Sequence, residues 1–161
     1  QVYNRSMNTK TFKVFLDLEE TVITSWNEGL LCNAARVREF LAEQKATNFT
    51  VFSFAVWNDQ DKADFERLHR RSLERALDCT VLACPSVEDF MQADTSLTGV
   101  QFDSLTDFIS IRGKVGAFTS WVRFHELGDA LLVDDVVPNL DVVNRDTGEV
   151  TRFINVRDIH D

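Results

Sequence analysis

The chain has 161 residues, of which 44% are hydrophobic and 27% are charged. This length and composition predict a single soluble globular domain with a core of ordinary size, and they exclude a disordered chain. Acidic residues outnumber basic residues by 26 to 17, and the net charge is −9. This balance argues against a protein that binds nucleic acid strongly through many phosphates. No apolar run approaches the roughly 18 residues that span a membrane, so we expect no membrane partner.

The ends and the cysteines of the chain allow two further expectations. The first six residues, before Met7, have the character of a remnant of an expression tag, so the predicted domain is one unit over residues 7–161. The three cysteines include no CxxC pair. We therefore expect neither a disulfide scaffold nor a tetrahedral zinc site, and we predict a reducing, cytoplasmic location.

The first half of the chain alternates short apolar runs with helical patterns. Residues 11–18, 49–54 and 79–84 are short apolar runs that predict buried strands. Apolar residues at three- and four-residue steps predict a helix at 30–41. A second helix begins after a cap at Asn58 or Asp59, and its predicted apolar face consists of Phe65, Leu68, Ser72 and Ala76.

The second half is harder to interpret. Residues 86–112 mix aromatic and acidic residues, with a helix start near Val87 and a turn-like stretch at 95–99. This stretch is too short for a full cap domain, so we expect a small flap or insertion at most. A helical pattern then runs from Lys114 to a stop at Gly128, and a strand at 130–133 follows. Residues 139–144 predict either a helix or the first strand of a hairpin that is closed by a turn at 146–148.

Strands that alternate with helices predict a three-layer α/β fold. Its sheet would be doubly wound, mostly parallel and Rossmann-like, with helices on both faces and no large cap domain. Ligands of such sheets bind beyond the carboxyl ends of the strands. The candidate site residues are therefore those at which a predicted strand ends: Asp17 with Glu19, Ser53, and Asp134 with Asp135.

These residues have a common chemistry. Asp17 and Glu19 occupy alternate positions, which point the same way in extended backbone. Two such carboxylates repel each other unless a cation or a shared proton compensates. With Asp134 and Asp135 they supply the hard oxygen ligands that Mg²⁺ prefers. Taken singly, these residues have ordinary interpretations: Glu19 as a solvated loop residue, and Asp134 with Asp135 as a helix cap. Lys114, which opens a predicted helix after Gly113, offers a positive charge near the same edge, but a single lysine is most often solvated.

The order of the motifs is more specific than any one of them. FLDLEETVI, TVFS, RGK and LLVDDVVPN follow one another in this order, and the set resembles the haloacid dehalogenase superfamily, which contains many Mg²⁺-dependent phosphohydrolases. The resemblance implies that the chain hydrolyses a phosphomonoester on a small molecule, a nucleotide or the end of a macromolecule. It implies an aspartyl-phosphate on Asp17, an acid and base at Glu19, and phosphoryl binding by Ser53 and Lys114. Mg²⁺ would be held by Asp17, the backbone carbonyl of Glu19, Asp134 and Asp135.

The first motif departs from the common pattern of that superfamily. Its second acid is Glu19 rather than Asp, as in the Asp-x-Glu-Gly-Thr motif of the enolase-phosphatase branch. Glu20 stands where that branch has glycine, and it adds bulk and charge beside the site. A misplacement of about 1 Å can reduce a rate roughly 100-fold, so a catalytically weak or inactive binding or regulatory module is an alternative.

A second alternative is a DnaQ-like 3′–5′ exonuclease. The first motif also resembles that family, and His125 with Asp129 resembles its last motif in outline. This alternative gives no role to Asp134 or Asp135. The arginines at 67, 70, 71 and 75 are the only feature that favours a nucleic-acid substrate, and we interpret them, together with His69, as a solvated helix face.

Overall fold

The computed structural model describes residues 10–160, so the expected tag remnant and the start at Met7 lie outside the described residues. Six strands form one sheet in the order β3-β2-β1-β4-β6-β5. The parallel strands are β1 (Lys13–Leu16), β2 (Asn48–Val51), β3 (Thr80–Ala83), β4 (Ala130–Asp134) and β6 (Val150–Asn155). Strand β5 (Leu140–Val143) is antiparallel to β6. The predicted α/β class with a mostly parallel sheet is confirmed.

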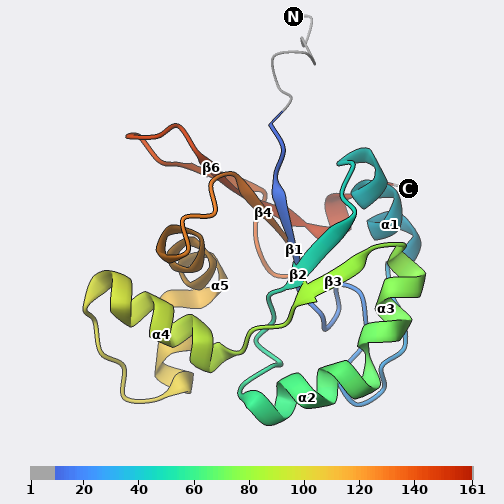
Figure 1. The fold of residues 1–161 in the computed structure, drawn as a ribbon, viewed down its shortest axis with the longest axis horizontal. Coiled ribbons are helices and arrows are strands. Elements are labelled where there is room, and N and C mark those ends of the chain that lie inside the picture. The colour runs from blue at the N-terminus through green and yellow to red at the C-terminus, as the bar shows by residue number, and fades with distance from the viewer. Residues whose placement is uncertain (1–9, 161) are drawn as a thin grey trace, which may run out of the picture.

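Helices cover both faces of this sheet (Figure 1). Helices α1 (Ala34–Glu43), α2 (Asp59–Leu68) and α3 (Arg70–Leu77) lie on one face, and α4 (Val87–Thr98) and α5 (Leu105–Phe124) lie on the other. Because successive strand side chains point to opposite faces, Val14 and Leu16 of β1 pack with the first set of helices and Phe15 packs with the second. The predicted three layers are present. A 3₁₀ turn, η2 (Val156–Asp158), follows β6.

The winding of the chain creates a switch point beside β1. The chain passes from β1 outward to β2 and β3, and then returns to place β4 on the other side of β1. Backbone pairing continues to the strand ends, where the amide of Asp17 donates to the Val133 carbonyl at 3.0 Å and the amide of Phe52 donates to the Leu16 carbonyl at 2.8 Å. The residues that follow β1, β2 and β4 therefore emerge together at one edge of the sheet, where ligands of this fold bind.

The predicted second helix is broken. Asn58 caps its start as expected, but α2 ends at Leu68. The next residue, His69, has a φ of −123° and a ψ of −30° and separates α2 from α3. The buried series is Phe65, His69, Leu73 and Leu77, while Leu68 is 49% exposed. The prediction of a solvated His69 is wrong, because its ring is buried and packs 4.8 Å from the ring of Trp26. The buried face therefore continues from Phe65 at four-residue steps, because residues four apart lie on one side of a helix. Leu68, which was predicted to belong to this face, does not.

Residues 86–112 belong largely to the second helical layer. A capping box at Ser86 and Asp89 starts α4, which continues through the expected turn and ends at Gly99, whose φ is 77°. Phe90 of α4 and Phe108 of α5 are buried against the sheet.

The hairpin alternative for the C-terminal part is correct. Strands β5 and β6 pair in antiparallel fashion, and their turn is closed by the Gly148 amide, which donates to the Asn144 carbonyl at 2.7 Å. Among the helices of residues 10–160, none has both the length and the apolar character required to cross a membrane.

Candidate active site

Asp17 is fixed by the turn that follows β1. The Leu18 carbonyl accepts the amides of Thr21, Val22 and Ile23 at 2.9–3.1 Å, which turns the chain back on itself directly after the strand. Thr21 consequently faces Asp17, and its hydroxyl donates to Asp17 Oδ2 at 3.1 Å. The Asp17 carboxylate is therefore held at the end of β1 while only 5% of the residue is exposed.

The side chain of Lys114 extends to the Asp17 carboxylate from α5, which covers the face of the sheet opposite to α1, α2 and α3. Its Nζ lies 3.1 Å from Asp17 Oδ1, 2.7 Å from Asp134 Oδ2 and 4.7 Å from the centre of the Phe54 ring. The residue directly before it, Gly113, has a φ of 65° and a ψ of −176° and interrupts α5. A single ammonium thus connects residues at the ends of β1, β2 and β4.

Three buried carboxylates cluster here, and two of them, Asp17 and Asp134, contact this ammonium. Asp17, Asp134 and Asp135 each offer an oxygen within 4.8 Å of the others, and the Val136 amide donates to Asp134 Oδ1 at 2.8 Å. Three negative charges against one lysine leave an excess of two negative charges in a buried place, which is costly.

The donor set of this cluster fits a divalent cation. Asp134 Oδ2 is fully buried and lies 2.7 Å from the Lys114 ammonium, which it shares with Asp17. Carboxylates and carbonyls are the ligands that Mg²⁺ uses in proteins. A divalent cation would balance the two excess charges.

The electrostatics of the cluster follow from its burial. Burial raises the pKa of Asp17 more than the Lys114 ammonium lowers it, and a proton shared with Asp135 raises it further. Burial likewise raises the pKa of Asp134 and of Asp135. Burial alone would lower the pKa of Lys114, but the carboxylates of Asp17 and Asp134 outweigh it and raise that pKa. Without a cation, the site therefore tends to retain a proton.

Glu19 is held apart from this cluster. Its Oε2 accepts the amide of Trp26 at 2.8 Å, within the loop that follows the turn, and the buried carboxylates that could share a cation are Asp17, Asp134 and Asp135. The expectation that Asp17 and Glu19 form one pair assumed extended backbone. The structure instead has β1 ending at Leu16, with an isolated bridge between Glu19 and Ile23.

Ser53 lies where the sequence predicted, at the carboxyl end of β2. It is 1% exposed, and its Oγ accepts the amide of Ala55 at 3.1 Å. Its neighbour Phe54 contacts Lys114, a contact that the sequence reasoning missed. The first motif included Thr21, but no role was assigned to its hydroxyl. The signal for Phe54 was weak, since it was only an aromatic residue next to Ser53.

Two of the four arginines that favoured nucleic acid have acidic partners: Arg70 is 2.7 Å from Glu66, and Arg67 is 3.1 Å from Asp64. Arg70, Arg71 and Arg75 line a hollow of about 870 Å³ at the end of the sheet where β2 and β3 begin. Asp129 directly precedes β4, and its carboxylate accepts the Val150 amide at 2.7 Å. It lies at the opposite end of the strands from Asp17, which weakens the exonuclease alternative.

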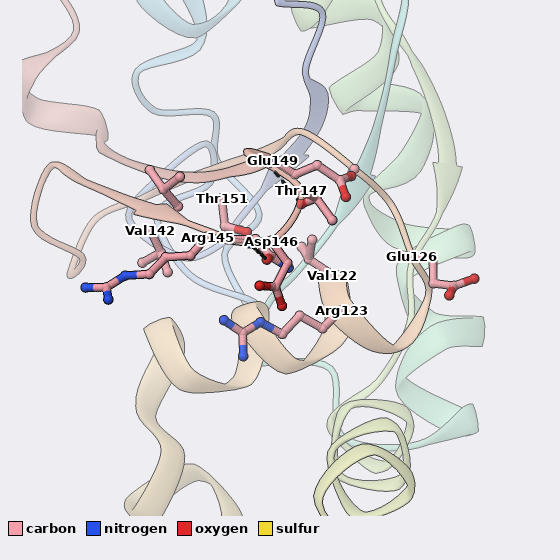
Figure 2. A pocket seen from close by; sticks show the side chains of 12 residues that line it. Val122, Arg123, Glu126, Val142, Arg145, Asp146, Thr147, Glu149 and Thr151 are labelled. Carbon is pink, nitrogen blue, oxygen red and sulfur yellow. Dashed lines mark hydrogen bonds between the residues drawn. The ribbon is translucent and has the colours of Figure 1, made fainter.

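A groove of about 660 Å³ lies between the end of α5 and the β5–β6 hairpin (Figure 2). Its charged lining residues have both signs, for example Arg123, Arg145 and Asp146. The groove lies at the end of the sheet where β4 and β6 begin, whereas Asp17 lies at the end where the parallel strands finish. None of the predicted site residues lines it.

No protein-family model, curated protein or solved structure matches this chain significantly. The geometry of the site and the order of its residues in the sequence therefore provide the basis for a proposed function.

Proposed function

We propose that the chain is a Mg²⁺-dependent phosphohydrolase of the haloacid dehalogenase type, which hydrolyses phosphomonoesters through an aspartyl-phosphate. The observation that carries the proposal is the buried Asp17, which lies at a strand end between Thr21 and Lys114 and beside two further carboxylates. A carboxylate that is held rigidly between donors is suited to attack an incoming phosphorus atom.

The reaction would proceed in two displacements. An oxygen of Asp17 attacks phosphorus and forms an O–P bond, while the bond from phosphorus to the leaving oxygen breaks and Glu19 gives that oxygen a proton. Glu19 then takes a proton from water, and the water oxygen attacks phosphorus and breaks the bond to Asp17. Inorganic phosphate and the free carboxylate result.

The remaining site residues would bind charge. Asp17, Asp134, Asp135 and the Glu19 carbonyl would hold Mg²⁺, which when bound screens the repulsion between the nucleophile and an anionic substrate. The Lys114 ammonium would bind a phosphoryl oxygen and keep the nucleophile oriented. The Ser53 hydroxyl accepts a bond from Ala55 and keeps its own hydrogen, which a phosphoryl oxygen could accept.

The substrate would be a phosphomonoester on a small molecule, a nucleotide or the end of a macromolecule. The net charge of −9 and the acidic partners of Arg67 and Arg70 give no support for strong binding to a nucleic-acid backbone. We also propose a cytoplasmic location, because the three cysteines are free thiols and a reducing compartment keeps thiols free.

A second candidate is a catalytically weak or inactive regulatory module of the same fold. The bond between Glu19 and the Trp26 amide favours it, because that bond already occupies one oxygen of the expected acid and base. For turnover, the Glu19 carboxylate must share or release this bond. A module that only binds Mg²⁺ or a phosphorylated partner would not need to.

Hydrolysis of p-nitrophenyl phosphate with Mg²⁺ tests the proposal. We expect Asp17→Asn to reduce kcat by about 10³-fold or more, as is typical for loss of a nucleophile. Asp141→Asn is the matched control, since it neutralises an exposed aspartate that pairs with Arg152 on the hairpin, and it should retain full activity. Activity of the wild type at the level of Asp17→Asn would overturn the enzymatic proposal. Mg²⁺ binding by calorimetry in that case would favour the regulatory module.

A further inference from the structure

The helix that carries Lys114 is interrupted directly before that residue. Gly113 has a φ of 65° and a ψ of −176°, a combination that is essentially restricted to glycine. The interruption divides α5 into residues 105–112 and 114–124. The direction in which Lys114 leaves the helical layer therefore depends on how the second part is fixed relative to the first.

One buried carboxylate contacts both parts. Asp94 of α4 is completely buried. It accepts Arg112 Nε at 2.9 Å on Oδ2 and Arg112 Nη2 at 3.1 Å on Oδ1. It also accepts the Ser120 hydroxyl at 2.7 Å on Oδ2. Arg112 is the last residue before the break and Ser120 lies beyond it, so Asp94 connects the two parts through a single side chain.

The contacts of Asp94 are those of a rigid connection. The paired bonds from Arg112 fix the plane of the carboxylate, and the side chain of Arg112 also lies 5.3 Å from the centre of the Phe102 ring. The Ser120 bond is short and buried, where a hydrogen bond between side chains is strengthened by the low local dielectric. Ser120 lies six residues after Lys114 on the same helical segment, so its position sets the position of Lys114.

We propose that Asp94 is a positioning residue for Lys114: through Arg112 and Ser120 it fixes the angle of α5 at Gly113 and so directs the Lys114 ammonium between Asp17 and Asp134. The role of Lys114 in a reaction rests on the proposed phosphohydrolase function, whereas its placement by Asp94 does not. The side-chain partners that the structure gives for Asp94 are Arg112, Ser120 and Thr98, so Asp94 acts on the reacting groups only through α5.

Two hydroxyl variants separate positioning from general stability. Ser120→Ala detaches the part of α5 that carries Lys114 and leaves the Asp94–Arg112 ion pair intact. Thr98→Val is the control within α4, because the Thr98 hydroxyl donates to the Asp94 backbone carbonyl at 2.9 Å and lies 3.3 Å from Asp94 Oδ1. Both variants remove a hydroxyl that bonds to Asp94, and only Ser120→Ala removes a bond between Asp94 and α5.

The first measurement needs no catalytic activity. Lysine acetylation of the folded protein, resolved by residue with mass spectrometry, reports how well Lys114 is held, and the exposed Lys45 serves as the internal standard. We expect Ser120→Ala to raise the relative rate at Lys114 roughly three- to tenfold, the effect of losing one hydrogen bond. Thr98→Val should leave it within about twofold. Equal rates at Lys114 in the wild type and Ser120→Ala would overturn the proposal.

The second measurement is a double-mutant cycle on kcat for p-nitrophenyl phosphate. If Ser120 acts through Lys114, Ser120→Ala lowers kcat in the wild type and has no further effect in Lys114→Ala. Equal reductions in both backgrounds would mean a general structural role and would overturn the proposal. If the wild type has no phosphatase activity, the proposed function fails, and the acetylation rates alone decide the positioning of Lys114.

Discussion

The two buried carboxylate clusters of this protein have opposite charge balances. Asp94 is paired with Arg112 through both of its oxygens and also accepts the hydroxyl of Ser120. The Asp17 cluster has three carboxylates and one lysine, which pairs with Asp17 and Asp134. Burial is therefore common to both clusters, whereas an uncompensated charge is found only at the sheet edge.

The difference shows which kind of buried acid indicates a ligand. A balanced cluster has no need of a further partner and contributes to a unique arrangement of helices. An unbalanced cluster must take up protons or a cation, and this is the reason that burial raises the pKa of all three carboxyls at the sheet edge. If this comparison is correct, the two clusters should respond in opposite ways to mutation, to Mg²⁺ and to pH.

The largest effect is expected from removing the cation of the balanced cluster. Arg112→Met leaves Asp94 buried with an uncompensated charge, which should lower the free energy of unfolding by about 3–5 kcal/mol. Urea denaturation measures this loss. Arg152→Met is the control, because its partner Asp141 is largely exposed and such pairs contribute about 0–1 kcal/mol. A similar small loss in both variants would contradict the assignment of Asp94 as a tightly paired buried acid.

Mg²⁺ should stabilise the protein through the unbalanced cluster. At a concentration about 100 times its Kd, a ligand that binds only the folded state adds about 2.7 kcal/mol to the free energy of unfolding. Asp134→Asn should abolish this gain, because it removes a buried ligand that lies beside Lys114. Denaturation with and without Mg²⁺ gives the difference directly. Retention of the full gain in Asp134→Asn would place the Mg²⁺ elsewhere.

The Mg²⁺ gain should also depend on pH. The pKa of Asp17 and of Asp135 is raised above the ordinary value of 3.8, so these groups contribute stability in the metal-free protein below pH 3.8 that is lost as the pH rises through the folded pKa. Mg²⁺ must displace the retained protons. Its stabilising effect should therefore increase from mildly acidic to neutral pH, and an equal effect at both would contradict a shared proton.

A smaller effect is expected from neutralising one acid of the unbalanced cluster. Asp135→Asn should raise the stability of the metal-free protein at neutral pH by about 1 kcal/mol, the size of a typical single-site change, because it removes a charge that Asp134 and Glu20 repel. The gain should vanish below pH 3.8, where the wild-type carboxyl is also neutral. A loss of stability at neutral pH would show that Asp135 is already compensated.

Much of the fold could be predicted from the sequence because its strands and helices are marked by local patterns. The strand runs, the cap at Asn58 and the acids at Asp17 and Asp134 all have local signals, and the structure places them as expected. The break at His69 could not be predicted in this way. It depends on the packing of the ring against Trp26, a contact between segments more than forty residues apart in the sequence.

The site was predictable in its acids and not in its supporting contacts. Lys114 was predicted from its place at the start of a helical pattern, directly after Gly113. The Asp94 contacts that fix this helix involve residues 18 and 26 positions apart, with no motif between them. The bond from the Trp26 amide to Glu19 depends on the shape of a loop. Such contacts follow from tertiary structure, so periodicity and motif spacing do not reveal them.

The smallest effect that we expect concerns Glu20, which lies in the loop after β1. Glu20 has a φ of 61°, in the left-handed region that favours glycine, and its charge raises the pKa of the nearby Asp135. Glu20→Gly should stabilise the protein by about 0.5–1 kcal/mol, the relief of the left-handed conformation less the entropy cost of glycine. It should also raise kcat/KM for p-nitrophenyl phosphate about two- to tenfold, because it removes a negative charge near the site.

Asp78→Gly separates these two effects. Asp78 also has a left-handed backbone, with a φ of 52°, but it follows α3 and precedes β3, so it lies at the end of the parallel strands opposite to Asp17. The two variants should therefore show the same gain in urea denaturation, since both relieve the same kind of backbone conformation. Only Glu20→Gly should change kcat/KM, because only Glu20 is close enough to repel charge at the unbalanced cluster. An equal change of kcat/KM in both variants would mean that stability, and not the charge of Glu20, limits the activity.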